Sequence, residues 1–492
     1  MSLHWLLWAL PCEAGPVDVY GFGAAAMGRG LGGVALSDGV GGMFNNPASL
    51  QQLESSEAIA GYALLRHDLT ELPGVRWDTN QDGFINDADE PLYPPSQYGR
   101  ADGLMIGLGR NIGDRLGLGI AAFMPVDRLM DISTFDAQIP TWFMYRSRMH
   151  RFEAAVGGGW EMFPGLSVGG AVEIIAQARF SMRGTLSASV TGAQEGDEEL
   201  GELVGDMTLD IHEMSLNVEP NLAPIIAFIW DVGQLIEPLD GLSLGGTWRG
   251  TTGLPVDVDI DLQINASIED VGDFEATTIT LLAPFELLMF DHYVPSRLSL
   301  GAAWRWRDTL RVYGDLRRTA WDEMQLNIAQ VIQGSVSGQL IGEDALTLND
   351  GNAYDLVLIP TWSSRTGIEV RLPDLQVGEI LGVADFGTMR PVLRAGWSFE
   401  PTPLIEMGTD VALLDTDRMV FTGGIGLEHG SPFGLMEGPV VWDAFFQHHA
   451  LAAGNIPVVY SDKYSPGAPV SEGGIPVGGR LWAAGVQGSM YY

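Results

Sequence analysis

The chain has 492 residues, including 64 glycines and 14 tryptophans, and only 18% of its residues are charged. Its formal net charge of −37 excludes nucleic acid and anionic membrane surfaces as partners, because their phosphates would repel the chain. No apolar run approaches the roughly 20 residues of a transmembrane helix, so a membrane-spanning fold would have to be a closed β-barrel.

The N-terminus is typical of a short signal peptide. Residues 1–14 are mostly apolar and end in the small residue Ala14, with Cys12 two places before it, which predicts cleavage after Ala14. The missing basic start leaves open a mis-assigned initiator methionine or a buried first strand. Ala9 and Pro11 fit a lipoprotein signal around Cys12 poorly. Because Cys12 is the one cysteine of the sequence, cleavage would leave the mature chain without disulfides or thiol chemistry.

The next segment, Gly21–Leu50, is too rich in glycine to suit a helix or a strand. Glycine lets a backbone turn tightly and pack against walls, Pro47 fixes its own φ, and the preceding Asn46 is pushed out of the helical region. We therefore predict that this segment folds into a compact plug. The residues expected to matter most are Gly28, Gly30, Asn46, Pro47 and Ala48.

From residue 57 onwards, about fourteen windows alternate apolar and polar residues with a period of two, as a sheet with one apolar face does. They are 57–66, 102–110, 116–126, 149–162, 166–183, 213–231, 241–262, 275–304, 309–324, 362–372, 390–400, 417–428, 439–450 and 479–492. These windows predict an all-β fold, a 14-stranded antiparallel transmembrane β-barrel.

Two of the windows assign the faces of the predicted strands. In Val256–Leu262, three carboxylates share one face, which cannot meet lipid, and four aliphatic side chains share the other. In Arg297–Arg307, leucines and tryptophans alternate with arginines and a serine. Both windows predict apolar side chains towards lipid and polar side chains towards the lumen.

The connections between the windows are alternately short and long. Tight turns are expected at 111–115, 163–165 and 307–308, and long loops at 67–101, 127–148, 184–212 and 325–361. This asymmetry is typical of periplasmic turns and extracellular loops. The last window ends in Tyr492, and a terminal aromatic residue on such a strand resembles the signal that the barrel-assembly machinery reads.

Several motifs together resemble the FadL-type outer-membrane transporters of long-chain fatty acids and other hydrophobic compounds. They are the glycine-rich segment that closes on Asn46–Pro47–Ala48, the hairpin Tyr293–Trp321, the strand exit Val392–Pro403 and the strand entry Asp415–Arg418. The resemblance implies a signal peptide at 1–14, a hatch at 15–55 inside the lumen, and a barrel at 56–492 with long extracellular loops. It also implies a location in the bacterial outer membrane.

The resemblance further implies transport of hydrophobic small molecules, either long-chain fatty acids or hydrocarbons, by loop capture, hatch movement and lateral exit through the barrel wall. In the family, the third strand kinks inward and opens a hole in the wall. Pro125 lies late in the third predicted strand, which agrees with that position, and the alternative is that Pro125 simply ends the strand. The long loops match the family poorly, so the ligand and the residues that contact it stay open.

The implied partners are the hydrophobic ligand, outer-membrane lipid and lipopolysaccharide, and the barrel-assembly machinery, and the chain is expected to be a monomer. A different class of function also stays open. The barrel could be a non-transport surface protein, either an adhesin or a structural protein stiffened by calcium. A lumen that carries no lipid after purification would favour that class.

The segment Asp78–Asp89 fits the pattern of a calcium loop. Carboxylate and amide oxygens at positions one, three and five converge on a hard cation, Gly83 permits the sharp turn, and the residue after it offers its carbonyl. The predicted ligands are Asp78, Asn80, Asp82, Phe84, Asn86 and Asp89. An aspartate at the twelfth position, as in the loops of dockerin repeats, predicts a lower affinity than a glutamate would give. The alternative is an acidic surface loop between the first two strands.

Other motifs are given a structural interpretation. Gly165–Gly169 and Gly241–Gly245 both match the hydrolase pattern G-x-S-x-G, but each serine opens an alternating strand, whereas a nucleophile elbow needs a strand-to-helix turn. We therefore predict that the chain is not an enzyme. His448 and His449 point to opposite faces of a strand, which disfavours joint metal binding and predicts girdle or loop histidines. The spacing of apolar residues in Glu198–Met214 predicts a short amphipathic helix.

Overall fold

The computed structural model describes most of the chain after the predicted signal peptide. The described residues are 15–36, 38–72, 75–76, 100–127, 141–142, 144–145, 150–190, 204–251, 256–268, 277–289, 294–323, 327–328, 334–338, 341–348, 354–355, 358–376, 388–404, 413–430, 438–456, 470–471 and 475–492. Residues 1–14 and the predicted calcium loop therefore lie outside the described residues.

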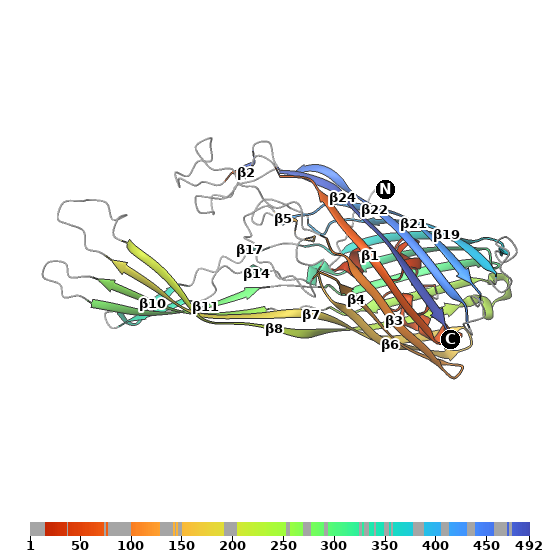
Figure 1. The fold of residues 1–492 in the computed structure, drawn as a ribbon, viewed down its shortest axis with the longest axis horizontal. Helices are drawn as coiled ribbons and strands as arrows, with labels where there is room; N and C mark the ends of the chain where they lie inside the picture. The colour runs from red at the N-terminus through yellow and green to blue at the C-terminus, as the bar shows by residue number, and fades with distance from the viewer. Residues whose placement is uncertain are drawn as a thin grey trace, which may run out of the picture.

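Fourteen antiparallel strands close into a barrel (Figure 1). They are β1 (Glu57–Leu69), β3 (Gly103–Ile112), β4 (Leu116–Pro125), β6 (Glu153–Phe163), β7 (Leu166–Val190), β8 (Val204–Asp231), β9 (Leu242–Arg249), β12 (Arg297–Trp306), β13 (Leu310–Thr319), β18 (Thr361–Arg371), β19 (Met389–Glu400), β21 (Arg418–His429), β22 (Val440–Ile456) and β24 (Ile475–Tyr491). Each strand pairs with its neighbours in this order, and β24 pairs with β1 to close the ring. The expected fold class is confirmed.

The two ends of the barrel differ in their connections. Turns of a few residues join β3 to β4, β6 to β7 and β12 to β13 at the end where β1 begins and the chain finishes. We call this the short-turn end. The opposite, long-loop end carries the longest connections and four small two-stranded sheets. These sheets are β2 (Val75–Arg76) with β23 (Val470–Ser471), β5 (Thr141–Trp142) with β20 (Leu413–Leu414), β14 (Asn327–Ile328) with β17 (Tyr354–Asp355), and β15 (Gly334–Gly338) with β16 (Ile341–Leu348).

The barrel wall is apolar outside and polar inside, as its alternation predicts. In β12, Leu298, Leu300 and Trp304 are exposed on the outer face, while Arg297 and Ser299 are buried in the lumen. Along the last strand, the outward residues are again apolar or aromatic. They include Trp482, Val486, Met490 and Tyr492. A wall with this arrangement can meet lipid on its outer face.

Two of the predicted windows join a barrel strand to a strand that lies outside the ring. β10 (Val256–Ile268) and β11 (Thr277–Met289) pair with each other, and β10 pairs in parallel with the far half of β7. Figure 1 shows β7 and β8 continuing out of the barrel to meet them. The interpretation of Val256–Leu262 as part of a lipid-facing barrel strand is therefore wrong, because period-two alternation marks a sheet without saying which sheet it is.

The predicted helix at Glu198–Met214 is also not found in its described part. Residues 204–214 belong to β8 and pair with the far half of β7. The remaining residues of that segment, 198–203, lie outside the described residues. Long-range pairing with β7 overrides the helical spacing of the apolar residues here.

The segment before β1 lies inside the ring, where Figure 1 draws it in red. It contains α1 (Pro16–Tyr20), α2 (Ala24–Met27), and the 3₁₀ turns η1 (Gly39–Gly42) and η2 (Pro47–Gln52). Three more 3₁₀ turns are η5 (Val232–Gln234), η6 (Glu237–Leu239) and η7 (Trp321–Glu323). Within the described ranges, no helix has the length and apolar character needed to cross a membrane.

Candidate functional site: the hatch inside the barrel

The hatch segment, residues 15–36 and 38–55, turns back on itself within the lumen. Gly21 and Gly23 follow α1 with φ angles of 86° and 81°, which residues with a side chain rarely adopt. A Cβ on Gly23 would lie 2.9 Å from the carbonyl oxygen of Gly41. The glycines at this turn therefore let the chain reverse direction and pack closely on η1.

The hatch backbone packs directly on glycines of the barrel wall. A Cβ on Gly169 of β7 would overlap the backbone of Ala48, and a Cβ on Gly367 of β18 would overlap the carbonyl of Arg29. These wall glycines could not be recognised from the sequence, because a glycine in an alternating strand gives no indication of what packs against it. They form the space that the hatch fills.

The two hatch glycines singled out from the sequence lie at similar contacts. A Cβ on Gly28 would lie 2.9 Å from the Cα of Gly424 in β21. Gly30 has a φ of 93° and packs against Gly396 of β19. Neither position has room for a side chain, so both glycines let the hatch touch the wall backbone to backbone.

Asn46 fastens three parts of the structure together. Its Oδ1 accepts a hydrogen bond of 2.9 Å from the backbone N–H of Ala48, which caps η2. Its Nδ2 donates to the carbonyl of Val34, at 2.6 Å, and to the carbonyl of Phe228 in β8, at 2.9 Å. The side chain is buried, and Pro47 begins η2 immediately after it. Asn46 thus joins two stretches of the hatch to the wall.

A chain of buried ion pairs joins the hatch to the far wall. Arg29 contacts Asp38 at 2.6 Å and Glu369 of β18 at 2.9 Å. Glu369 also binds Arg394 of β19 at 2.8 Å, and Arg394 binds Asp443 of β22 at 2.5 Å. Burial alone would lower the pKa of Arg29, but Asp38 and Glu369 raise it above its ordinary value. Arg29 therefore remains charged inside the barrel.

A second buried cluster surrounds Asp18 of α1. Arg249 of β9 contacts Asp18 at 2.6 Å and Glu173 of β7 at 2.8 Å, and Arg297 of β12 also donates to Asp18. Burial raises the pKa of Asp18, but the attraction of Arg249 and Arg297 outweighs burial and holds the pKa below its ordinary value of 3.8. Ionised Asp18 thus anchors the first helix of the hatch to the wall.

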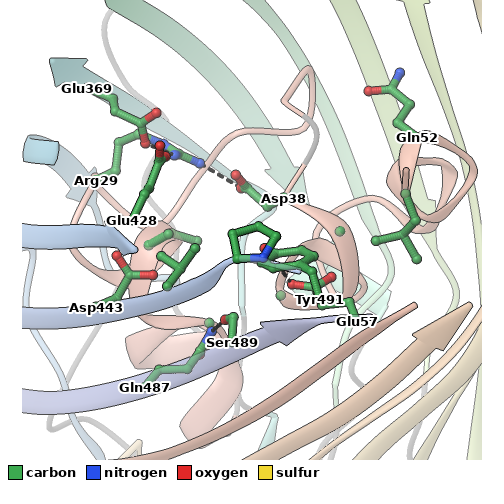
Figure 2. A pocket seen from close by; sticks show the side chains of 18 of the residues that line it. Arg29, Asp38, Gln52, Glu57, Glu369, Glu428, Asp443, Gln487, Ser489 and Tyr491 are labelled. Carbon is green, nitrogen blue, oxygen red and sulfur yellow. Dashed lines mark hydrogen bonds and ion pairs between the residues drawn. The ribbon is translucent and has the colours of Figure 1, made fainter. Parts of the chain in front are cut away.

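A polar cavity of about 480 Å³ lies between the hatch and the wall at the short-turn end (Figure 2). Ten charged side chains take part in its lining. They are Arg29, Asp38, Glu54, Glu57, Arg311, Glu369, Arg371, Arg394, Glu428 and Asp443. Charged groups at this density hold water strongly, so the cavity is a poor environment for an apolar molecule.

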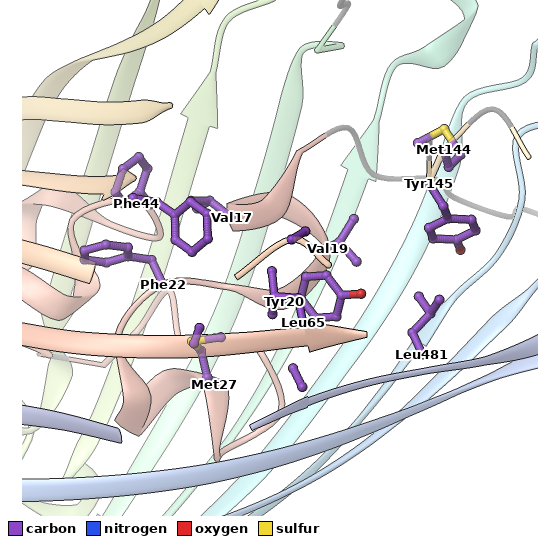
Figure 3. Close-up of a cluster of buried hydrophobic side chains, with 14 of the residues drawn as sticks. Val17, Val19, Tyr20, Phe22, Met27, Phe44, Leu65, Met144, Tyr145 and Leu481 are labelled. Carbon is purple, nitrogen blue, oxygen red and sulfur yellow. The ribbon is translucent and has the colours of Figure 1, made fainter. Parts of the chain in front are cut away.

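An apolar cluster also packs around the hatch (Figure 3). The hatch members of this cluster are Val17, Val19, Tyr20, Phe22, Ala24, Met27, Val40, Met43, Phe44, Leu50 and Leu53. The cluster extends towards the long-loop end through Leu65 and Leu481 of the wall and through Met144 and Tyr145 of a long connection. The charged cavity thus lies at the short-turn end, and the apolar cluster continues past the hatch to the long-loop end.

The apolar cluster also meets only part of the wall. Its wall members run from β22 through β24, β1, β3, β4 and β6 to β7, and they include Phe445, Leu481, Leu65, Met105, Phe123 and Ala155. The buried luminal residues of the opposite wall are mostly polar or charged, among them Arg365 of β18. An apolar molecule above the hatch would therefore meet its most compatible surface on the first side of the wall, which includes β3 and β4.

The chain matches the family model of outer membrane protein transport proteins (OMPP1/FadL/TodX) over residues 6–372, which is more than half of its length. The chain belongs to this family. Members are outer-membrane β-barrels that form channels for hydrophobic compounds, and this FadL/TodX-family protein is accordingly an outer-membrane barrel. In such barrels the short turns face the periplasm and the long loops face outwards.

Solved structures show the same fold. One is the crystal structure of a Pseudomonas aeruginosa FadL homologue, with 14% sequence identity, a TM-score of 0.56, and 98% of this chain and 99% of that chain covered. Another is the CymD monoaromatic hydrocarbon channel, with 13% identity, a TM-score of 0.50, and 96% and 97% covered. At these identities the similarity concerns the fold alone. No curated protein sequence matches the chain.

In this FadL/TodX-family barrel, Pro125 is the last residue of β4 and lies opposite Gly103 of β3. Because Val126 donates to the carbonyl of Asp102, the position of the missing Pro125 N–H faces β6 rather than β3. The ladder between β4 and β6 ends nearby, at the pair Phe123↔Glu153. Pro125 thus ends its strand, and the described pairing of β4 with β3 shows no register shift.

The predicted calcium ligands Asp78, Asn80, Asp82, Phe84, Asn86 and Asp89 lie outside the described residues. The calcium site therefore stays a prediction. Among the described residues, no group of three or more His, Cys, Asp or Glu side chains is placed to hold a metal ion.

The remaining motifs have structural places in the barrel. Ser167 and Ser243 lie near the starts of β7 and β9, and Ser167 donates a hydrogen bond of 2.8 Å to the hatch residue Gln51. His448 is partly exposed, whereas His449 is buried in the lumen, where its ring lies 5.0 Å from that of Tyr20. His449 is therefore a luminal residue beside the hatch rather than a girdle or loop histidine.

Proposed function

We propose that this barrel takes up hydrophobic small molecules, long-chain fatty acids or hydrocarbons, from outside the cell and releases them sideways into the outer membrane. The observation that carries the proposal is that the apolar cluster around the hatch continues to the extracellular end of the barrel, whereas the cavity at the periplasmic end is lined by charged side chains.

This arrangement favours capture from outside. Val17, Tyr20 and Phe22 are buried together with Trp142 and Tyr145 of the long connections, so an entering molecule would reach an apolar surface when these side chains move apart. Burying apolar surface yields roughly 25 cal/mol per Å², so capture needs no other energy source. Monoaromatic hydrocarbons, which the similar CymD channel carries according to its name, belong to the same chemical class.

The periplasmic side disfavours straight passage along the barrel axis. An apolar molecule that continued downward would have to displace water from Arg29, Glu369 and Arg394 without replacing its hydrogen bonds. Their ion pairs also hold the hatch to the wall. Movement of the hatch around Asn46–Pro47–Ala48 would instead let the molecule shift among the side chains of the apolar cluster.

The wall beside the apolar cluster offers a sideways exit. The pairing of β4 and β6 ends at Phe123↔Glu153, close to Pro125, which has no N–H to donate towards β6. Met105 and Phe123 make the inner surface apolar on the side of β3 and β4, while the buried carboxylate of Glu153 lies on the side of β6. We infer that cargo leaves through the wall between the extracellular ends of β4 and β6.

Uptake into cells tests the proposal. Cells whose own transporters of this family are deleted would receive the gene, and uptake of a labelled fatty acid, an alkane and a monoaromatic compound would be measured against a labelled sugar. The proposal predicts faster uptake of at least one hydrophobic compound with unchanged sugar uptake. Equal increases for the sugar would indicate an open pore, and no increase for any hydrophobic compound would contradict transport and favour a surface protein.

A further inference from the structure

Glu153 is a buried carboxylate in the lumen whose charge has no hydrogen-bonded partner. It is the first residue of β6 and is only 1% exposed. Among the residues that the structure describes, neither of its carboxylate oxygens has a hydrogen-bond partner. Burying a carboxylate without a partner costs free energy, so we expect a hydrogen-bond donor or a cation to bind this group.

The charges around Glu153 are also unbalanced. Asp18, Glu153 and Glu173 supply three carboxylates, while Arg249 and Arg297 supply two guanidiniums. Both guanidiniums are already bound to Asp18 or Glu173. Within this set of five groups, the carboxylates therefore outnumber the guanidiniums by one; Arg317, which lines the small pocket beside Asp18, donates to Ser299.

Gly15 is the residue that lies against Glu153. It precedes α1, is buried, and has so little space that a Cβ would overlap Oε1 of Glu153. The backbone nitrogen is about 2.5 Å from a residue's own Cβ position, so the Gly15 nitrogen lies within about 5 Å of that oxygen. An opposite charge at this distance would stabilise the ionised carboxylate.

The sequence predicts cleavage of the chain between Ala14 and Gly15. Signal peptidase would hydrolyse this amide: water gives its hydroxyl group to the Ala14 carbonyl and its hydrogen to the Gly15 nitrogen. That nitrogen then takes up a proton, because an α-amino group has a pKa of about 8. Before cleavage the same nitrogen is a neutral amide.

We propose that the new amino terminus of Gly15 is the missing cation, and that its ammonium group binds the buried carboxylate of Glu153. Removal of the signal peptide would then complete the cluster that holds α1 to β6, β7, β9 and β12. The hatch would be docked fully only in the processed protein. Gly15 suits this position because any side chain would collide with Glu153.

The ammonium group of Gly15 can be tested by amine labelling, because the chain has few primary amines. Lys463 is the one lysine of the sequence, so a mature Lys463→Arg protein has its α-amine as the only primary amine. Mass spectrometry of the protein purified from outer membranes should give Gly15 as the first residue. Reductive methylation of the folded barrel in detergent should then label that amine at least about tenfold more slowly than in the urea-unfolded chain, because labelling requires local opening.

Variants at Glu153 distinguish protection of the amine by an ion pair from protection by burial alone. Glu153→Gln in the same background should restore fast labelling, whereas Glu400→Gln, a control at a buried glutamate that binds Arg365, should leave the amine protected. If Glu153→Gln fails to fold, Glu153→Asp replaces it in the test, because this variant keeps the charge. Its amine should be labelled more slowly than in the unfolded chain but faster than in the unchanged barrel. A first residue other than Gly15, or equal labelling of the unchanged and Glu153 variants, would overturn the proposal and leave Glu153 as a neutral carboxylic acid.

Discussion

The side-chain amide of Asn46 donates a hydrogen bond of 2.9 Å to the backbone carbonyl of Phe228, which ties the hatch to β8. The same amide holds Val34, and its oxygen caps η2 at Ala48. Replacing Asn46 with alanine removes all three hydrogen bonds and should weaken hatch docking by about 2–4 kcal/mol.

We expect Asn46→Ala barrels to show frequent openings in planar bilayers that the unchanged protein lacks. Asn111→Ala provides the comparison, because Asn111 makes a single hydrogen bond to the hatch, to the carbonyl of Leu53. Its effect should be clearly smaller. Equal conductance for the two variants would show that Asn46 has no special role in docking.

Arg29 should matter more than an exposed arginine. Arg29→Ala leaves Asp38 and part of the charge of Glu369 uncompensated in a buried site, which should cost about 3–5 kcal/mol of hatch docking. Arg480→Ala removes an ion pair with Asp68 that is largely exposed and should cost at most about 1 kcal/mol. Susceptibility of the hatch to protease added from the periplasmic side would measure the difference, and similar cleavage rates would contradict it.

The wall glycines should be intolerant of side chains where the hatch packs on them. Gly169→Val places a side chain onto the backbone of Ala48 and should displace the hatch without preventing barrel formation. Gly423→Val is the matched control, since a Cβ there would meet no atom within 4 Å. The shift in gel mobility on heating verifies folding, and liposome swelling with small sugars should then be faster for Gly169→Val alone.

Hatch docking should respond to acid through Asp18. In the docked hatch the pKa of Asp18 lies below 3.8, the ordinary value that the group would regain on release. The stabilisation of hatch docking by Asp18 is therefore complete above pH 3.8 and is lost as the pH falls through the lower, docked pKa. Conductance should therefore be unchanged from about pH 5 to pH 8 and should rise in stronger acid. Asp18→Asn should open the barrel at neutral pH and flatten this dependence, and an acid response that survives the substitution would assign it to another group.

Period-two alternation allowed the number of barrel strands to be predicted correctly, and each of the fourteen windows overlaps one barrel strand. It did not separate β9 from β10 or β11 from β12, because strands inside and outside the ring share the same local pattern. The faces of β12 were predicted correctly, since Leu298 and Ser299 differ strongly in their compatibility with lipid.

The hatch could be recognised from its glycines, but its partners on the wall could not. Glu369 and Arg249 each look like an ordinary polar residue of an alternating strand. Their contacts with Arg29 and Asp18 depend on register and on the path of the hatch, and they join positions hundreds of residues apart. Such long-range pairings leave no mark in the local sequence.

Lateral exit is the central claim, and a reversible lock between β4 and β6 tests it most directly. Ala122 and Ala154 are direct partners across these strands, and cysteines at paired antiparallel positions can form a disulfide. A second pair, Leu244→Cys with Ala302→Cys across β9 and β12, locks a distant part of the wall as a control. Uptake of a labelled fatty acid or alkane should fall when Ala122→Cys/Ala154→Cys is oxidised, return on reduction, and stay unchanged in the control pair. Undiminished uptake through the oxidised β4–β6 lock would contradict lateral exit at this position.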